Sequence, residues 1–118
     1  MRAVTVELPL PPLANHYLRV AGGHIYKTAE AKAYRARCEA SCRAALPTGP
    51  FTGPVRVRFT WYRRRRMGDL DNVAKVLLDA LSGLLYADDK QIVEIHARRD
   101  DGRREQPGIT LTVEEVVP

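Results

Sequence analysis

The stretch from Val55 to Tyr62 restricts the fold more than any other part of the sequence. Val55, Val57, Phe59 and Trp61 alternate there with basic, polar or aromatic residues. A period of two residues is typical of a β-strand that has one buried face and one exposed face. Because the buried face must be covered, the segment is predicted to lie in a sheet with other elements packed on one side.

Three further segments are predicted to be strands. Apolar and polar residues alternate at 4–8, 92–98 and 109–113, and a proline-rich stretch ends the first of them. A hydrophilic turn at 100–104 separates the last two, so these two strands are expected to pair as a hairpin that closes the sheet. A smaller hairpin is expected around the Gly22-Gly23 turn, between residues 17 and 27.

Two helices are predicted, each with one apolar face. The first is the alanine-rich segment 29–46, with Thr28 as its N-cap and Pro47 after its end. The second begins near Leu70 and carries a broad apolar face, with Gly83 near its end. The apolar residues of that face are Val73, Val76, Leu77, Ala80, Leu81 and Leu84. The expected fold is α+β: a mixed β-sheet with two helices packed on it.

Length and composition favour one compact, non-membrane domain. A chain of 118 residues, 45% hydrophobic and 28% charged, fits a single domain spanning 1–118. No apolar run is long enough to cross a bilayer, and no signal segment opens the chain, so a cytoplasmic location is expected. The net charge of +5 is concentrated in two arginine clusters, at 63–66 and at 98–104.

The two cysteines are expected to be reduced and buried. Cys38 and Cys42 lie four residues apart in the first helix, where side chains share a face but lack disulfide geometry. A zinc site would need more ligands nearby, whereas His16, His24 and His96 are scattered singly along the chain. Ordinary buried thiols are therefore the preferred interpretation.

Acidic residues gather around the second helix and admit two interpretations. Asp69 and Asp71 open the helix, Lys75 follows one turn later, and the pair Asp88-Asp89 comes after its end. In a structural interpretation, the aspartates interact with the helix dipole, which stabilises by about 0.3–1 kcal/mol each, and charges four residues apart form ion pairs. In a chemical interpretation, the carboxylates converge on Mg²⁺, which prefers oxygen ligands. The residues alone leave both open.

A bound Mg²⁺ would polarise a phosphodiester and activate a water molecule, with Lys75 close to the scissile phosphate or leaving group. The arginines Arg63, Arg64, Arg65 and Arg66 precede these acids directly. Cations around a carboxylate site suit a polyanionic substrate, because they hold the phosphate backbone while the acids hold the metal. This pattern indicates nucleic acid as a class. Arg19, on an arm of the small hairpin, is a further candidate contact.

The sequence from Asp69 to Ile92, DLDNVAKVLLDALSGLLYADDKQI, resembles the signature of the RusA family of Holliday junction resolvases of bacteria, phages and prophages. The pattern is long: D-x-D-N-x-x-K, then D-A-L, then G-x-x-Y-x-D-D-x-Q. The proline-rich segment 8–12, followed by Asn15, Tyr17 and Arg19, is also similar to that family. Leu13, Ala14 and Gly68 depart from it, since polar residues and a proline are common at those positions.

The resemblance implies a homodimeric, Mg²⁺-dependent endonuclease, with Mn²⁺ able to substitute, that makes paired nicks in four-way branched DNA during recombination and repair. It assigns metal binding to Asp69, Asp71 and Asp89, an essential role to Lys75, and a metal or supporting role to Asp88. Asn15 and the basic residues named above are the candidate DNA contacts. A two-fold junction suits a two-fold protein.

The sequence leaves two other functions open. One is a non-catalytic dimeric DNA-binding protein in which the aspartates only cap the helix and pair with cations. The other is a metal-dependent nuclease acting on other branched or single-stranded nucleic acid.

Overall fold

The computed structural model describes residues 2–12, 18–22, 24–64, 68–102 and 105–117. The chain forms six strands, two α-helices and one short 3-10 helix in these ranges. In chain order they are β1 (Ala3–Leu8), β2 (Leu18–Ala21), β3 (His24–Lys27), α1 (Ala29–Ala45), β4 (Val55–Tyr62), α2 (Leu70–Leu81), η2 (Asp89–Gln91), β5 (Ile92–Asp100) and β6 (Gly108–Glu115). The predicted α+β class, with two helices and a mixed sheet, is confirmed.

The main sheet has the strand order β1-β6-β4-β5. β6 pairs antiparallel with both β1 and β4, whereas β5 pairs only with β4 and runs parallel to it. The prediction that the last two strands pair with each other is therefore wrong, because β4 lies between them. Burial explains the order: Ile109, Leu111 and Val113 of β6 are fully buried and need a central position.

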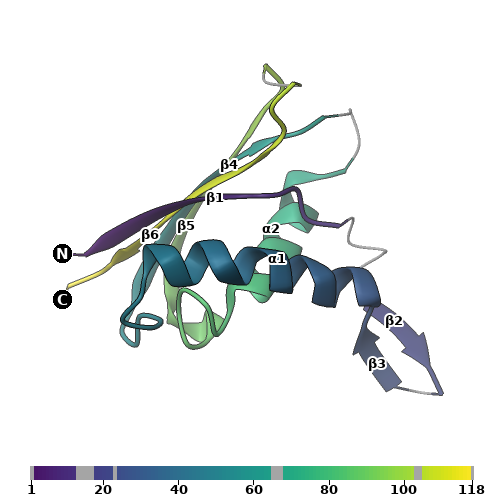
Figure 1. Ribbon diagram of the computed structural model, residues 1–118, viewed down its shortest axis with the longest axis horizontal. Coiled ribbons are helices and arrows are strands. Elements are labelled where there is room, and N and C mark those ends of the chain that lie inside the picture. Colours follow the sequence, from purple (N-terminus) through teal and green to yellow (C-terminus); the bar gives the residue numbers. More distant parts are fainter. Residues whose placement is uncertain (1, 13–17, 23, 65–67, 103–104, 118) are drawn as a thin grey trace.

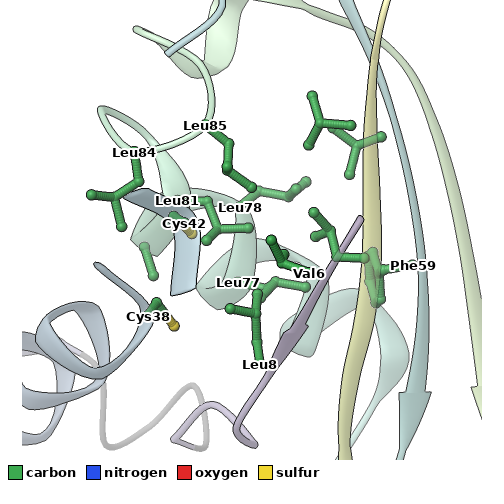
Figure 2. Packing of buried hydrophobic residues seen from close by; sticks show 14 of the residues in the cluster. Val6, Leu8, Cys38, Cys42, Phe59, Leu77, Leu78, Leu81, Leu84 and Leu85 are labelled. Carbon is green, nitrogen blue, oxygen red and sulfur yellow. The ribbon is translucent and has the colours of Figure 1, made fainter. Parts of the chain in front are cut away.

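Both helices lie on one face of this sheet (Figure 1). Val57 and Phe59 of β4 point into that face and are buried, and Leu77 and Leu81 of α2 pack against the same core. Cys38 and Cys42 of α1 lie in this core as well (Figure 2), both fully buried as free thiols. The expectation of reduced, buried cysteines is confirmed. Desolvation raises the pKa of both thiols, and that of Cys42 to about 12.

The two helices begin and end where local chemistry requires. Thr28 caps α1, its Oγ1 accepting a hydrogen bond from the backbone N–H of Ala31 at 3.2 Å. At the C-terminal end of α2, the carbonyl oxygens of Ala80 and Ser82 accept hydrogen bonds from Nη1 of Arg35 in α1, at 2.9 and 2.6 Å. These bonds satisfy carbonyl groups at the end of α2 and fix it against α1.

The predicted small hairpin, β2–β3, forms a separate two-stranded sheet that projects from the N-terminal end of α1 (Figure 1). Lys27 ends this hairpin, and its Nζ lies 3.0 Å from a carboxylate oxygen of Asp79 in α2. This ion pair links the β2–β3 hairpin to α2, the helix that carries the acidic residues.

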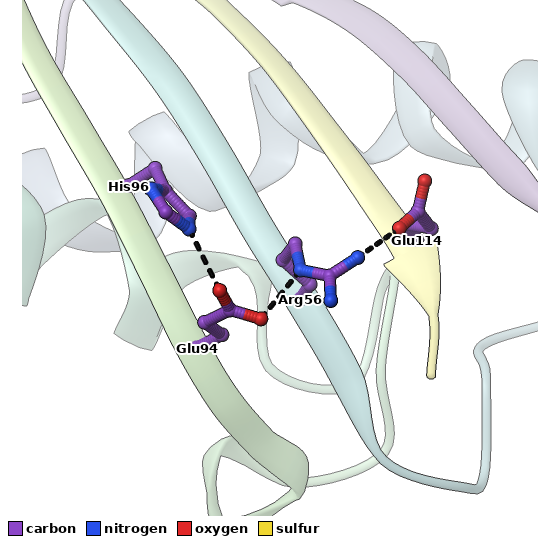
Figure 3. Close-up of polar contacts among 4 residues, drawn as sticks. All are labelled: Arg56, Glu94, His96 and Glu114. Carbon is purple, nitrogen blue, oxygen red and sulfur yellow. Dashed lines mark hydrogen bonds and ion pairs between the residues drawn. The ribbon is translucent and has the colours of Figure 1, made fainter. Parts of the chain in front are cut away.

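The other face of the sheet carries a chain of charged contacts (Figure 3). Arg56 of β4 donates to Glu94 of β5 on one side and to Glu114 of β6 on the other, while His96 contacts Glu94 at 3.0 Å. The hydrogen bond from His96, followed by that from Arg56, lowers the pKa of Glu94. Because Arg56 is flanked by two carboxylates, its charge is balanced within the protein.

Candidate active site

Two acidic residues open α2 from an exposed position. Asp69 is the N-cap residue and Asp71 lies in the first turn, as the sequence predicts. The preceding Gly68 has φ 88°, a left-handed conformation that favours glycine and that proline cannot adopt. The turn into this helix is therefore built differently from one with proline at that position.

The side chains of Asp69, Asp71 and Lys75 contribute no hydrogen bond or ion pair to the described part of the fold. Asp69 occupies the capping position, yet its side chain makes no capping hydrogen bond. None of the three side chains forms a hydrogen bond or ion pair with a described residue, and all three residues are exposed. Asp79, the expected helical partner of Lys75, binds Lys27 instead. Among the described residues the structural interpretation thus lacks its capping bond and ion pairs here, although both aspartates still lie at the helix end that favours negative charge.

The second acidic pair, Asp88 and Asp89, follows α2 in a loop whose backbone is held by hydrogen bonds. The backbone N–H of Phe51 donates to the carbonyl of Leu85 at 3.0 Å, and the N–H of Ala87 donates to the carbonyl of Phe51 at 3.1 Å. Between these bonds lies Tyr86, which is fully buried and donates its hydroxyl to the carbonyl of Leu78. The backbone leading to Asp88 is therefore fixed on both sides.

Asp88 and Asp89 differ in what they do. The Oδ1 of Asp88 accepts the backbone N–H of Lys90 at 2.9 Å, which caps η2. That bond, followed by a hydrogen bond with Asp89, lowers the pKa of Asp88. Asp88 is thus engaged in the local fold, whereas Asp89, the first residue of η2, presents its carboxylate at the surface.

Gln91 is a supporting residue that the sequence analysis did not single out. Its Nε2 donates to the carbonyls of Phe51 and Gly53, both at 2.8 Å, and its Oε1 accepts the N–H of Asp88 at 2.7 Å. One side chain therefore ties the acidic pair to the loop before β4. The only hint in the sequence was its place in the D-D-x-Q pattern.

The donor chemistry suits a hard cation, but a complete ligand set is not assembled. The carboxylates at Asp69, Asp71 and Asp89 are exposed oxygen donors, the type that Mg²⁺ prefers. In the described ranges, however, no group of three or more histidine, cysteine or acidic residues lies close enough to hold a metal ion. Their joint role as metal ligands therefore stays a prediction.

The candidate DNA contacts are placed unequally. Arg63 is mostly buried and donates from Nε and Nη2 to the two carboxylate oxygens of Asp101, at 2.7 and 3.0 Å. Its guanidinium also lies over the ring of Trp61. Arg64, in contrast, is exposed. Arg65, Arg66 and Asn15 lie outside the described residues, as does the side chain of Arg19 in β2.

Within the described residues, neither helix is long and apolar enough to cross a membrane. Exposed carboxylates beside a lysine at a helix N-terminus, directly after a run of arginines, fit the class of nucleases.

Comparison with known proteins specifies the class further. The family described as Endodeoxyribonuclease RusA matches residues 9–114. Crossover junction endodeoxyribonuclease RusA of Escherichia coli K12 is 35% identical over 98 residues, which cover 80% of each chain. The proteins of Shigella sonnei and Enterobacteria phage 82 are 35% and 34% identical over the same length. This chain belongs to the RusA family of endodeoxyribonucleases, as its resemblance to that family implied.

Proposed function

We propose that this protein, working as a homodimer in a bacterial cell, resolves four-way DNA junctions by paired, Mg²⁺-dependent nicking. Its relatives in Escherichia coli and phage 82 are named crossover junction endodeoxyribonucleases. The observation that carries the proposal is the exposed, unpaired state of Asp69, Asp71 and Lys75 relative to the described residues. Charged side chains that form no hydrogen bond or ion pair with the described residues are available for a ligand and a substrate.

In this proposal Asp69, Asp71 and Asp89 hold the cation, and Asp88 fixes the loop from which Asp89 projects. Bound Mg²⁺ polarises a phosphodiester and lowers the pKa of a water molecule. Lys75 lies one turn after Asp71 and presents a positive charge to the scissile phosphate as negative charge develops on the leaving oxygen.

The basic residues divide into two roles in the same proposal. Arg63 is already bound by Asp101, so it fixes the end of β4 rather than contacting DNA freely. Arg64 is exposed and supplies a charge to the phosphate backbone. The affinity that such contacts provide falls as the salt concentration rises, and the contacts carry no sequence information.

Asp71→Asn tests the proposal because it removes one charge at nearly constant shape from an exposed position. The variant should fold and bind a four-way junction, while Mg²⁺-dependent nicking falls on the order of 100- to 1000-fold, as for loss of one group that stabilises developing charge. Asp79→Asn is the matched control on the same helix, because the carboxylate of Asp79 is bound by Lys27. It should nick at close to the wild-type rate.

Both proteins are assayed on labelled junction, fork, flap and linear duplex, with and without Mg²⁺. Full cleavage by Asp71→Asn would refute the assignment. Binding that is indifferent to Mg²⁺, with no nicking of any substrate, would favour the non-catalytic DNA-binding protein. Preferential cleavage of forks or flaps would favour a nuclease for other branched DNA.

A further inference from the structure

The parallel pairing of β4 with β5 brings the two arginine clusters, at 63–66 and at 98–104, to one edge of the sheet. Tyr62 at the end of β4 lies beside Asp100 at the end of β5. Because the strands run in the same direction, the chain leaves both of them at this edge. The next residues are Arg63 and Asp101, and the structure describes residues 63, 64 and 98–102 of the two clusters. Clusters that are distant in sequence are therefore neighbours in the fold.

Asp101 lies between one arginine of each cluster. Its Oδ1 accepts a hydrogen bond from Nε of Arg63 at 2.7 Å, and its Oδ2 accepts one from Nη2 of the same residue at 3.0 Å. Nε of Arg99 lies 3.4 Å from Oδ1 on the same carboxylate. Two guanidinium groups thus share one carboxylate, so this group of three side chains keeps a net positive charge.

The two arginines differ in how accessible they are. The side chain of Arg63 is 11% exposed, binds Asp101 with two of its nitrogens and lies over the ring of Trp61. The side chain of Arg99 is 46% exposed, and its guanidinium donates no hydrogen bond to a described residue. Arg99 is therefore oriented by Asp101 from one side while part of its guanidinium still faces solvent.

Strand alternation directs Arg99 and its neighbour Arg98 to opposite faces of the sheet. Arg99 lies beside Trp61, which is buried on the face that the helices cover, whereas Arg98 lies beside Thr60, which points to the other face. The helix α2, which begins with the acidic residues of the candidate active site, packs on the first of these faces (Figure 1). Of the two arginines, Arg99 shares a side of the sheet with those acidic residues.

We infer that Arg99 binds the DNA phosphate backbone beside the active site and that Asp101 is the residue that positions it. The inference rests on the proposed function and adds to it one binding residue and one positioning residue. A planar guanidinium suits this arrangement, because one edge can meet a carboxylate while the remaining N–H groups donate to phosphate oxygens. Such a contact holds the DNA in register without reading its sequence.

The role of Asp101 can be recognised by the sign of its effect on DNA affinity. By charge alone, a carboxylate close to DNA repels phosphate, so its removal should strengthen binding. A positioning residue behaves in the opposite way, because its removal leaves Arg99 without a fixed direction and weakens binding. Neutralising Asp101 therefore separates the two roles.

The first experiment measures the affinity for a labelled four-way junction by fluorescence anisotropy, without Mg²⁺ and at several salt concentrations. Arg99→Gln should raise Kd about 5- to 10-fold near physiological salt and reduce the slope of log affinity against log salt by about 1, as for loss of one phosphate contact. Arg98→Gln is the matched control, because it removes the same charge from the adjacent, 68% exposed side chain on the other face. Its Kd and slope should stay close to those of the wild type.

The second experiment tests Asp101 by a double-mutant cycle. Asp101→Asn should raise Kd, and in the Arg99→Gln background it should have no further effect, because it acts through that arginine. Asp101→Glu keeps the carboxylate and should bind the junction nearly as well as the wild type. Because Asp101 also binds Arg63, circular dichroism and urea denaturation verify that each variant is folded under the conditions of the binding assay.

The outcomes separate the inference from the proposed function. Equal Kd values and equal salt slopes for Arg98→Gln and Arg99→Gln would overturn the contact of Arg99 with DNA. An Asp101→Asn variant that binds the junction as tightly as the wild type, or more tightly, would overturn the positioning role. Because binding is measured without cleavage, a wild type that binds the junction but does not nick it in Mg²⁺ would refute the proposed function and leave the contact standing.

Discussion

Replacing Gln91 by methionine should loosen the acidic loop and measurably destabilise the protein. The change keeps the length of the side chain but removes three hydrogen bonds, to the carbonyls of Phe51 and Gly53 and from the N–H of Asp88. Each such bond contributes about 0.5–1.5 kcal/mol net. Gln91 is half-buried, so water replaces part of what is lost. We therefore expect the free energy of unfolding to fall by about 1.5–3 kcal/mol.

Urea denaturation at neutral pH measures this loss. Lys90→Met is the matched control, because Lys90 is exposed, is the next residue in the chain, and makes no side-chain hydrogen bond to a described residue. It should change the stability by less than about 0.5 kcal/mol. If Gln91→Met were as stable as this control, the three bonds would not hold the loop. Nicking by Gln91→Met should also fall by about 10- to 100-fold at unchanged junction affinity, the range typical of groups that orient metal ligands.

Two further predictions concern α1. Thr28→Ala removes the N-cap bond to Ala31 and should lower the free energy of unfolding by about 1 kcal/mol in urea, whereas Thr52→Ala, at an exposed loop position, should not. Burial raises the pKa of Cys42 from about 9 to about 12, so the unfolded chain loses this proton before the folded one does. Stability should thus be fully present below about pH 9 and decline towards pH 12, with a limiting slope of about 1.4 kcal/mol per pH unit for this thiol, and Cys42→Ala should flatten that decline.

Local sequence patterns predicted most elements, because they reflect interactions within a few residues. The alternation from Val55 to Tyr62 is strand β4, Thr28 caps α1, and Asp69 stands at the N-cap position of α2. The pairing of β5 with β6 was predicted wrongly because both strands alternate alike and are joined by a hydrophilic turn. What separates them is burial, which is decided by contacts with β1 and β4 that are distant in sequence.

The predictions for the site divide in the same way, between features set by nearby residues and contacts between residues distant in sequence. The family pattern selected Asp69, Asp71, Lys75 and Asp89, and the structure leaves all four exposed. The sequence pattern could not show that Arg63 is bound by Asp101, or that Gln91 donates to the carbonyl of Phe51, because these partners lie 38 and 40 residues away. Side-chain partners at such separations depend on the folded topology rather than on local spacing.

The central position of β6 has a consequence for biosynthesis. β6 is the final strand of the sheet in chain order, yet it joins β1 to β4, with Ala3 paired to Glu114 and Val57 paired to Val113. While the chain emerges from the ribosome, β1 and β4 have no common neighbour until residues 108–115 have been made. Contacts this distant in sequence close slowly, so the nascent chain should expose unpaired strand edges until a late stage. β6, the strand of the sheet that is synthesised last, therefore completes it by pairing with β1 on one side and β4 on the other.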